Sequence, residues 1–432
     1  MSSAAPERAV DEVAREATDL AAERQPSGLY LHIPFCVSHC PYCDFVVVAG
    51  REARGPGNRV AAFVGALERE VELRADALDE RWGSPAAPCR LPLDSVYLGG
   101  GTPSLLPAAA ISRLLGIVRA RFGLSADAEV TLEANPGPDE RGDLAAARRA
   151  GVTRLSIGAQ SLDAGQLRAL GRRHSPNDVA ATVLVARAAG IESISLDLLY
   201  DLPEASMASW EGTLDAAFAL EPDHLSLYAL TLDDPDVEGI TGTEGDHLPV
   251  PAGARRWRER ARRGQDDDRA AAMYRLADAR LTRAGFAWYE ISNWARPGHA
   301  SRHNLGYWTG RAWEAAGPGA HAFDGQTRRW NAARLDRYID ALSPADGAPP
   351  RLPPGARETV AIDDARAVTG EAAILALRTR AGLPAGACDE PALAAALAWG
   401  LDQGLLAQTS ANRLVLTMTG RLLANELFVR LL

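Results

Sequence analysis

The sequence contains no lysine, and all 46 of its basic residues are arginine. A chain without lysine cannot form a Schiff base between a side-chain amine and an aldehyde cofactor. It also lacks the lysine that a Walker loop places beside the phosphates of a nucleotide. These absences exclude pyridoxal chemistry through a lysine and nucleotide hydrolysis by a P-loop.

Long apolar runs are also absent. No stretch of 18 apolar residues occurs, and the first 25 residues contain no short apolar core of the kind that begins a secreted protein. Only five residues are cysteine, and three of them are clustered, which does not resemble a disulfide framework. We expect a cytoplasmic protein in a reducing environment, without a membrane span.

Positive charge is in deficit, because the formal net charge is −10. Proteins that bind nucleic acid generally need a basic face to meet the phosphate backbone. The sequence therefore predicts no nucleic-acid partner.

Short apolar runs alternate with alanine- and leucine-rich stretches of helical period. This alternation is typical of βαβ units and a parallel sheet, either as a barrel or as an open twisted sheet. Most runs end in glycine or a polar residue, and such strand ends form the site of a parallel barrel. Each polar residue could instead cap its own helix. The predicted strands are residues 29–34, 95–101, 129–136, 154–161, 193–200 and 224–231.

The remaining chain divides by composition. Residues 1–27 are predicted to be a loose segment, 28–240 the barrel, 241–342 an extension and 343–432 a small C-terminal domain with a hairpin near 413–417. Within 233–269, a Gly-, Asp-, Pro- and Arg-rich stretch is predicted to form a flexible lid. The arginine run 255–260 reads as a solvated helix face.

Three cysteines, Cys36, Cys40 and Cys43, follow the first predicted strand. Their spacing resembles that of radical S-adenosylmethionine (SAM) proteins. Three thiolates can hold three irons of a four-iron cluster, which leaves the fourth iron open to a small molecule. The competing interpretation is zinc with His39 as a fourth ligand, but His39 is adjacent to Cys40, and structural zinc usually has two separated ligand pairs.

Further stretches make the resemblance specific. Together they resemble the family of oxygen-independent coproporphyrinogen III dehydrogenases and, within it, the branch of radical SAM heme chaperones called HemW. The resemblance covers about residues 30–323 and implies an α/β fold, an incomplete parallel (β/α) radical SAM barrel with a small helical or winged-helix-like C-terminal domain. The stretches are residues 30–36, 99–104, 133–137, 154–161, 170–174 and 197–203.

The resemblance also implies site residues. Cys36, Cys40 and Cys43 would ligate a [4Fe-4S] cluster. A carboxylate can accept hydrogen bonds from the ribose or the ammonium of SAM, and an arginine can pair with its carboxylate. The implied SAM contacts are Tyr30, Tyr42, Gly100, Gly101, Thr102, Glu133, Gln160, Arg172 and Asp197.

Two features favour the chaperone branch. The dehydrogenases resemble one another in a fourth cysteine two places after the third, where this chain has Phe45, and in a longer N-terminal arm. In addition, His303, Tyr307 and Trp308 match a His-Asn-x-x-Tyr-Trp pattern that the chaperone branch associates with heme. From the residues alone, core aromatics and a hydrogen-bonded structural histidine are the favoured interpretation, and the resemblance shifts it to heme contact. The other candidate heme ligands are His299 and His321.

The sequence thus predicts a heme chaperone that binds heme and delivers it to apo-hemoproteins, with a [4Fe-4S] cluster and SAM as further cofactors. The alternative is a coproporphyrinogen III dehydrogenase that cleaves SAM to a radical, and a less favoured third reading is a radical SAM methyltransferase. The sequence does not fix the oligomeric state, and a homodimer is compatible with it.

Overall fold

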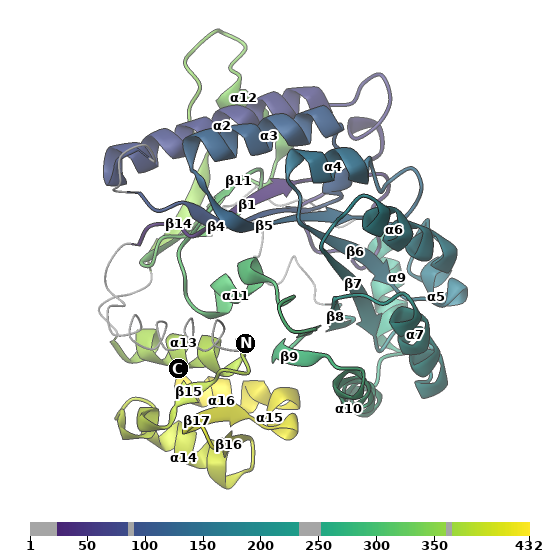
Figure 1. Cartoon of the computed structure of the whole chain (residues 1–432), viewed down its shortest axis with the longest axis vertical. Helices are drawn as coiled ribbons and strands as arrows, with labels where there is room; N and C mark the ends of the chain where they lie inside the picture. The colour runs from purple at the N-terminus through teal and green to yellow at the C-terminus, as the bar shows by residue number, and fades with distance from the viewer. Residues whose placement is uncertain (1–23, 85–89, 233–251, 360–364) are drawn as a thin grey trace.

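The computed structural model of the chain describes residues 24–84, 90–232, 252–359 and 365–432 (Figure 1). Most of the predicted loose N-terminal segment and the first half of the predicted lid lie outside these residues. The boundaries of the four predicted domains stay a prediction.

Six parallel strands form the centre of the main sheet. They pair in chain order, each with the next, as the alternating pattern predicted. They are β1 (Gly28–Ile33), β4 (Leu93–Gly100), β5 (Leu124–Ala134), β6 (Arg154–Gln160), β7 (Ser193–Tyr200) and β8 (His224–Ala229).

Shorter strands extend this sheet at both ends. β11 (Trp313–Ala316) pairs in parallel with β1 and is followed outward by three antiparallel additions. Within the described residues the sheet has twelve strands, and its outermost strands, β14 and β9, do not pair with each other. The expected α/β fold with an incomplete parallel barrel is therefore confirmed. The additions are β12 (His321–Phe323), β13 (Thr327–Asn331) and β14 (Gly355–Thr359), with β10 (Asn293–Ala295) and β9 (Ala287–Glu290) beyond β8.

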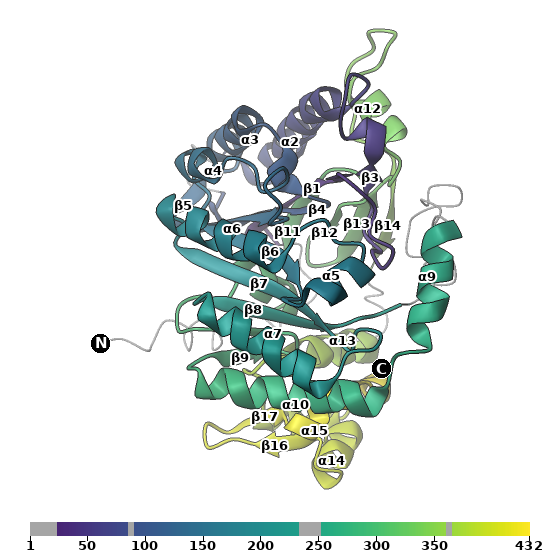
Figure 2. The same ribbon diagram turned by 90° about the vertical axis from the view of Figure 1, so that its right-hand side faces the viewer.

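The outer face of the sheet is apolar and covered by helices (Figures 1 and 2). In β1, Leu29, Leu31 and Ile33 are buried on this face, whereas Tyr30 and His32 point to the other, because side chains alternate along a strand. The inner face therefore carries polar side chains. The outer helices are α2 (Val60–Trp82), α3 (Ala108–Arg121), α4 (Leu144–Ala150), α5 (Ala164–Ala169), α6 (Pro176–Ala188), α7 (Met207–Ala219), α10 (Asp267–Arg283) and α12 (Leu335–Leu342).

One short helix, α11 (Arg302–Trp308), lies on the inner side of the sheet (Figure 1). The Glu129 carboxylate of β5 accepts hydrogen bonds from Ser301 Oγ and from the backbone N–H groups of Arg302 and His303. These are donors that a helix leaves unpaired at its start. The barrel interior thus fixes where α11 begins.

Helix α9 (Ala252–Arg262) contains the arginine run. Arg256 and Arg260 are exposed, as predicted, but Arg258 is only 4% exposed. The expectation of a solvated face is wrong at Arg258, because its guanidinium finds hydrogen-bond partners on a distant loop.

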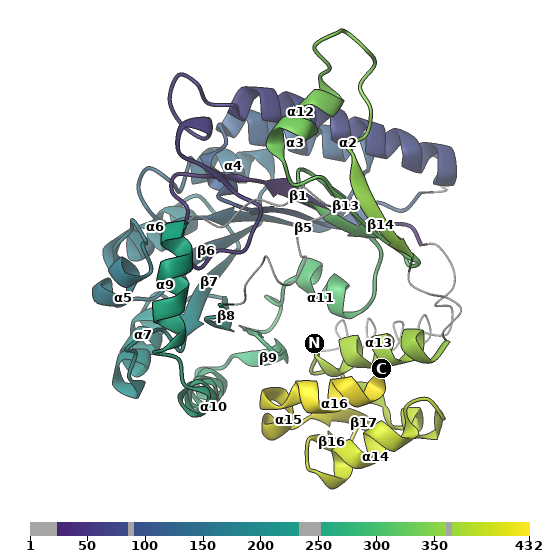
Figure 3. The same cartoon turned by 180° about the vertical axis from the view of Figure 1, so that it is seen from behind.

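The C-terminal region has its own apolar core and a three-stranded antiparallel sheet (Figure 3). The predicted hairpin is present as β16 (Leu406–Gln408) and β17 (Arg413–Leu416). No helix in the described parts of the chain is both long and apolar enough to cross a bilayer. The other elements are β15 (Leu383–Pro384), α13 (Ala365–Leu377), α14 (Ala394–Asp402), α15 (Met418–Leu422) and α16 (Ala424–Leu431).

Candidate functional site

The three clustered cysteines lie on a loop that is pinned at its base. β2 (Phe35–Cys36) pairs with β3 (Val48–Ala49), so the chain leaves and returns at one place. All three thiols are free, and burial raises the pKa of Cys36 to about 11 and that of Cys43 to about 12. A metal that binds these sulfurs would displace their protons.

Two polar side chains lie close to these sulfurs, one from the end of β4 and one from the loop between α5 and α6. Thr102 Oγ1 lies 3.6 Å from Cys36 Sγ, and Arg172 Nη1 lies 3.6 Å from Cys40 Sγ. A hydroxyl and a fixed positive charge both favour sulfur in its anionic form. The loop is therefore suited to hold thiolate ligands.

Asn135 connects these donors. Its amide nitrogen donates to Thr102 Oγ1 at 3.0 Å and to Glu140 at 2.9 Å, and its oxygen accepts from Arg172 at 2.5 Å. The ends of β4 and β5 thus converge, as predicted for the polar strand ends. The sequence placed Asn135 at a strand end but did not single it out as a site residue.

Glu133 faces the barrel interior at the end of β5. Its carboxylate accepts from the backbone N–H of Gly100 at 2.9 Å and from Tyr97 Oη at 2.7 Å. Burial nevertheless raises the pKa of Glu133 to about 7, since the loss of hydration outweighs these hydrogen bonds. Tyr97 was not predicted as a site residue, although its alternation along β4 places it on the same inner face.

The glycines after β4 allow close packing against the cysteine loop. A Cβ on Gly101 would lie 2.7 Å from the carbonyl oxygen of Phe35, and one on Gly100 would lie 2.5 Å from the His32 ring. Gly100 also has a φ of +112°, which side chains disfavour. Only glycine fits at these two positions.

A hydrogen-bonded pair joins the barrel wall to the cysteine loop. His32 Nε2 lies 2.7 Å from the carbonyl oxygen of Val46, and His32 Nδ1 lies 3.0 Å from Tyr30 Oη. Because a carbonyl only accepts, His32 donates from Nε2 and accepts the Tyr30 proton at Nδ1. Burial lowers the pKa of His32 to about 4, so the ring is neutral.

Asp197, on β7, begins a second chain of contacts. Ser156 and Ser195 donate to its carboxylate at 3.0 and 3.3 Å. Ser195 Oγ lies 2.8 Å from His224, whose other nitrogen lies 2.9 Å from Tyr289 Oη. Tyr289 Oη in turn accepts from the Asn304 amide at 3.3 Å. The carboxylate is thereby linked through three strands to helix α11.

A cavity of about 310 Å³ occupies the barrel interior. It brings together two of the predicted SAM contacts, Tyr30 and Glu133, with two of the predicted heme residues, His303 and Tyr307. Phe45, from the cysteine loop, also lines this cavity and is 68% exposed. Some residues of each predicted ligand site thus face the same cavity.

Other predicted residues lie outside this cavity. The Tyr42 ring packs on Trp257 of α9, with ring centroids 6.3 Å apart. Trp308 lies against Arg378 of the C-terminal region, whose guanidinium carbon is 4.6 Å from the ring centroid. Gln160 ends β6 with a φ of +63°, an uncommon value for a residue with a side chain.

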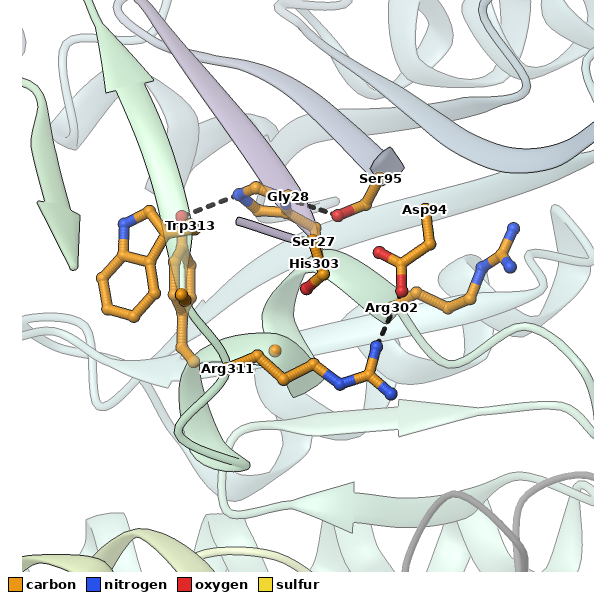
Figure 4. A pocket seen from close by; sticks show the side chains of 11 residues that line it. Ser27, Gly28, Asp94, Ser95, Arg302, His303, Arg311 and Trp313 are labelled. Carbon is orange, nitrogen blue, oxygen red and sulfur yellow. Dashed lines mark hydrogen bonds and ion pairs between the residues drawn. The ribbon is translucent and has the colours of Figure 1, made fainter. Parts of the chain in front are cut away.

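His303 separates the cavity from a smaller hollow at the starts of β1 and β4 (Figure 4). Its Nδ1 lies 3.0 Å from Ser95 Oγ and its Nε2 lies 2.8 Å from Tyr307 Oη. Burial lowers the pKa of His303 to about 3, so the imidazole is neutral. To ligate a metal, the ring would have to give up the hydrogen bond of the nitrogen that binds it. His299 and His321, the other candidates, do not line this cavity.

Comparisons with known proteins decide the family. The pattern of the Radical SAM superfamily matches residues 30–217. A protein of Mycobacterium tuberculosis (strain ATCC 25618 / H37Rv), named heme chaperone HemW, is 41% identical over 94% of this chain and 95% of its own length. The chain belongs to the HemW family. Heme chaperones HemW of Escherichia coli (strain K12) and Bacillus subtilis (strain 168) are 36% and 31% identical, over 68% and 92% of this chain and 70% and 97% of their own.

A solved structure shows the same fold. Coproporphyrinogen III oxidase from Escherichia coli, described as a radical SAM enzyme, superimposes with a TM-score of 0.73 at 24% identity and covers 98% of this chain and 93% of its own. At 24% identity, this similarity shows only that the two proteins share a fold.

Membership of the radical SAM family implies a [4Fe-4S] cluster and SAM. The cysteine loop fits the cluster, because it offers three free thiols beside a hydroxyl and a guanidinium. In the described residues, no group of three His, Cys, Asp or Glu side chains is arranged around a single metal ion, which is the arrangement that zinc would need. A cube of four irons, by contrast, takes its ligands at separate corners.

Proposed function

We propose that this protein is a heme chaperone, which binds heme and delivers it to apo-hemoproteins while carrying a [4Fe-4S] cluster with SAM at the open iron. The observation that carries the proposal is the 41% identity to a HemW heme chaperone along nearly the whole of both chains. The motif at His303 and Tyr307 supports it, because both side chains line the interior cavity.

Cys36, Cys40 and Cys43 would hold the cluster. In radical SAM proteins such a cluster supplies an iron that binds the methionyl end of SAM and an electron that can reduce it. Toward this ligand the chain offers the shielded carboxylates of Glu133 and Asp197. The remaining proposed contacts are Tyr30, Tyr42, Gly100, Gly101, Thr102, Gln160 and Arg172.

For heme, the chain offers a neutral imidazole and aromatic rings. A neutral ring nitrogen is what an iron ligand requires, and burial keeps His303 in this form. The Tyr97 ring stacks on the imidazole with ring centroids 5.2 Å apart, and the Tyr307 ring meets it edge-on with centroids 5.0 Å apart. Such flat rings can lie against a macrocycle. Trp308, on the opposite side of α11, would support the helix and not touch the cavity.

Heme titration tests the proposal. Protein reconstituted anaerobically with iron and sulfide is titrated with heme, and the Soret spectrum is compared between wild type and His303→Ala. We expect the variant to change the spectrum and to bind at least about tenfold more weakly, which corresponds to about 1.4 kcal/mol. His321→Ala is the matched control, because His321 does not line the cavity. An unchanged titration in His303→Ala removes this residue as the ligand.

Delivery requires a second assay. Heme-loaded protein is mixed with an excess of apomyoglobin as a test acceptor, and the rise of holomyoglobin absorbance is followed. We expect transfer to be faster from the wild-type protein than from serum albumin loaded with heme at equal concentration. Failure to transfer heme would contradict the chaperone proposal.

The dehydrogenase alternative makes a different prediction. Reduced, reconstituted protein with SAM, an electron acceptor and coproporphyrinogen III would form protoporphyrinogen and release carbon dioxide. Phe45 stands where the dehydrogenases resemble one another in a cysteine, and we expect no product. Product formation would overturn a function limited to heme delivery.

A further inference from the structure

Arg258 of α9 binds the cysteine loop directly. Its Nε donates to the carbonyl oxygen of Pro41 at 3.0 Å, and its Nη2 donates to the carbonyl oxygen of Cys43 at 3.1 Å. The same guanidinium forms an ion pair with the carboxylate of Asp44. One side chain, more than 200 positions later in the sequence, thus spans the stretch that carries the third cysteine.

These contacts restrain the loop where it has few bonds of its own. Between Cys36 and Asp44, one turn is closed by the Cys43 N–H group, which donates to the carbonyl oxygen of Cys40 at 3.1 Å. A planar guanidinium offers several donors in a fixed arrangement, so it sets the relative orientation of the groups that it bridges. Burying this charge is favourable only when its donors are paired.

Helix α9 is itself anchored to the barrel. Trp257 Nε1 donates to the carbonyl oxygen of Ala169, at the end of α5, at 2.9 Å. The Trp257 ring packs near Tyr42, and Ala261 is buried in an apolar cluster with Leu170 and Leu202. The cysteine loop is therefore braced against α5 and the end of β7 through α9.

We propose that Arg258 is a positioning residue for the cluster, which holds the segment from Pro41 to Asp44 in the conformation that presents Cys40 and Cys43 to iron. The proposal rests on the proposed cluster site, but the restraint acts on the polypeptide before any metal is bound. Neither the family pattern, which ends at residue 217, nor the cysteine motif includes this residue.

The test compares Arg258→Ala and Arg258→Lys with Arg256→Ala, an exposed arginine on the same helix. Each protein is reconstituted anaerobically, its iron and sulfide are counted, and the bleaching of the cluster by an iron chelator is timed. We expect bleaching to be at least about fivefold faster in Arg258→Ala. The bleaching rate of Arg258→Lys should lie between those of the wild type and Arg258→Ala, because an ammonium group keeps the charge but not the planar arrangement of N–H donors. Arg256→Ala should match the wild type.

A measurement without cluster separates this proposal from the function on which it rests. Amide hydrogen exchange of the apo-protein should be at least about tenfold faster at Cys43 in Arg258→Ala, with exchange in β5 and β6 unchanged. Added ethylguanidinium should slow exchange again by filling the vacated site. If wild-type protein takes up no cluster, the proposed function fails, whereas the exchange result still decides the role of Arg258.

Two outcomes would overturn the positioning role. One is that Arg258→Ala bleaches and exchanges its amide hydrogens at the same rates as the wild type. The other is a loss of cluster that follows global destabilisation, shown by faster exchange throughout the barrel and no recovery in Arg258→Lys or with ethylguanidinium.

Discussion

Among single residues, Glu133 best shows how burial changes chemistry. Two hydrogen bonds favour its charged form, yet its pKa lies near 7, because the protein around it replaces water. A carboxyl group with this pKa can be neutral in the empty protein and become charged when a cationic ligand arrives. That is a suitable property for a residue proposed to bind SAM.

The pH dependence of stability tests this. Between pH 4.5 and about 7 the folded state holds more protons at Glu133 than the unfolded chain does, so the free energy of unfolding falls as pH rises. We expect Glu133→Gln to remove up to roughly 3 kcal/mol of the stability difference between pH 5 and pH 8. Urea unfolding of the apo-protein at pH 5 and at pH 8 measures the free energy of unfolding at each pH.

Asp139→Asn is the control, since this residue is exposed. It should leave the difference between the two pH values as in wild type. If Glu133→Gln shows the same stability difference between pH 5 and pH 8 as the wild type, the Glu133 carboxyl titrates at its ordinary pKa.

Each cysteine of the loop can be tested in the same way. Cys36→Ala, Cys40→Ala and Cys43→Ala should each abolish the visible absorbance of the reconstituted cluster, because a cube that keeps only two protein ligands is labile. Cys388→Ala is the control, since Cys388 lies in the C-terminal region. Full absorbance in all three loop variants would refute the ligand assignment.

At the scale of elements, the end of β4 is held by glycines with no room beside them. We expect Gly101→Ala to lower the free energy of unfolding by about 1–3 kcal/mol, because the new methyl group meets the backbone of Pro34 and Phe35. Gly116→Ala, in the middle of α3 with open space around it, should instead stabilise by roughly 0.5–1 kcal/mol. Urea denaturation compares the two, and equal effects would contradict the packing argument.

The central strands and helices could be predicted because the apolar residues of each recur with a period that is visible within a single segment of the chain. The predicted stretches of helical period are present as helices, among them α2, α3 and α10. The short strands β11 to β14 could not be predicted. They have three to five residues each, and their place depends on an edge of β1 formed far earlier in the chain.

The site divides in the same way. A motif such as the cysteine loop is local, so its residues are readable from spacing. Arg258 is not readable, because its partners are backbone carbonyls, which every residue type provides. Trp308 belongs to a matched motif, yet the helix turns it away from His303 and toward Arg378. The spacing of a motif does not show that Trp308 and His303 point to different sides of the helix. That requires the position of the helix and its neighbours in the fold.

For the whole molecule, arginine joins the C-terminal region to the barrel. Arg421 pairs with both oxygens of Asp278 on α10, at 2.8 and 3.1 Å, and lies 4.6 Å from the ring centroid of Trp288. A largely buried pair of this kind is costly to break, because the remaining charge is left without a partner.

We therefore expect Arg421→Ala to weaken this junction by about 3–5 kcal/mol. Limited proteolysis should then cut between the two parts much faster than in wild type. Arg430→Ala, which removes a stacking contact with Trp399 inside the C-terminal region, should leave that cleavage rate unchanged. Equal cleavage in all three proteins would show that other contacts hold the junction.

In the described residues the twelve-stranded sheet does not close on itself, because β14 and β9 do not pair with each other, and this has a mechanical consequence. A closed ring of strands resists widening, because widening must tear a ladder of backbone bonds. In a curved sheet whose two margins are not joined to each other, the margins can move apart while every ladder between neighbouring strands stays intact. The β9 margin is bridged by its backbone to the C-terminal region, from Glu290 to Thr379, so that region would move with it. A guest broader than the resting hollow could thus be admitted by flexure of the wall, at modest cost and without unfolding any strand.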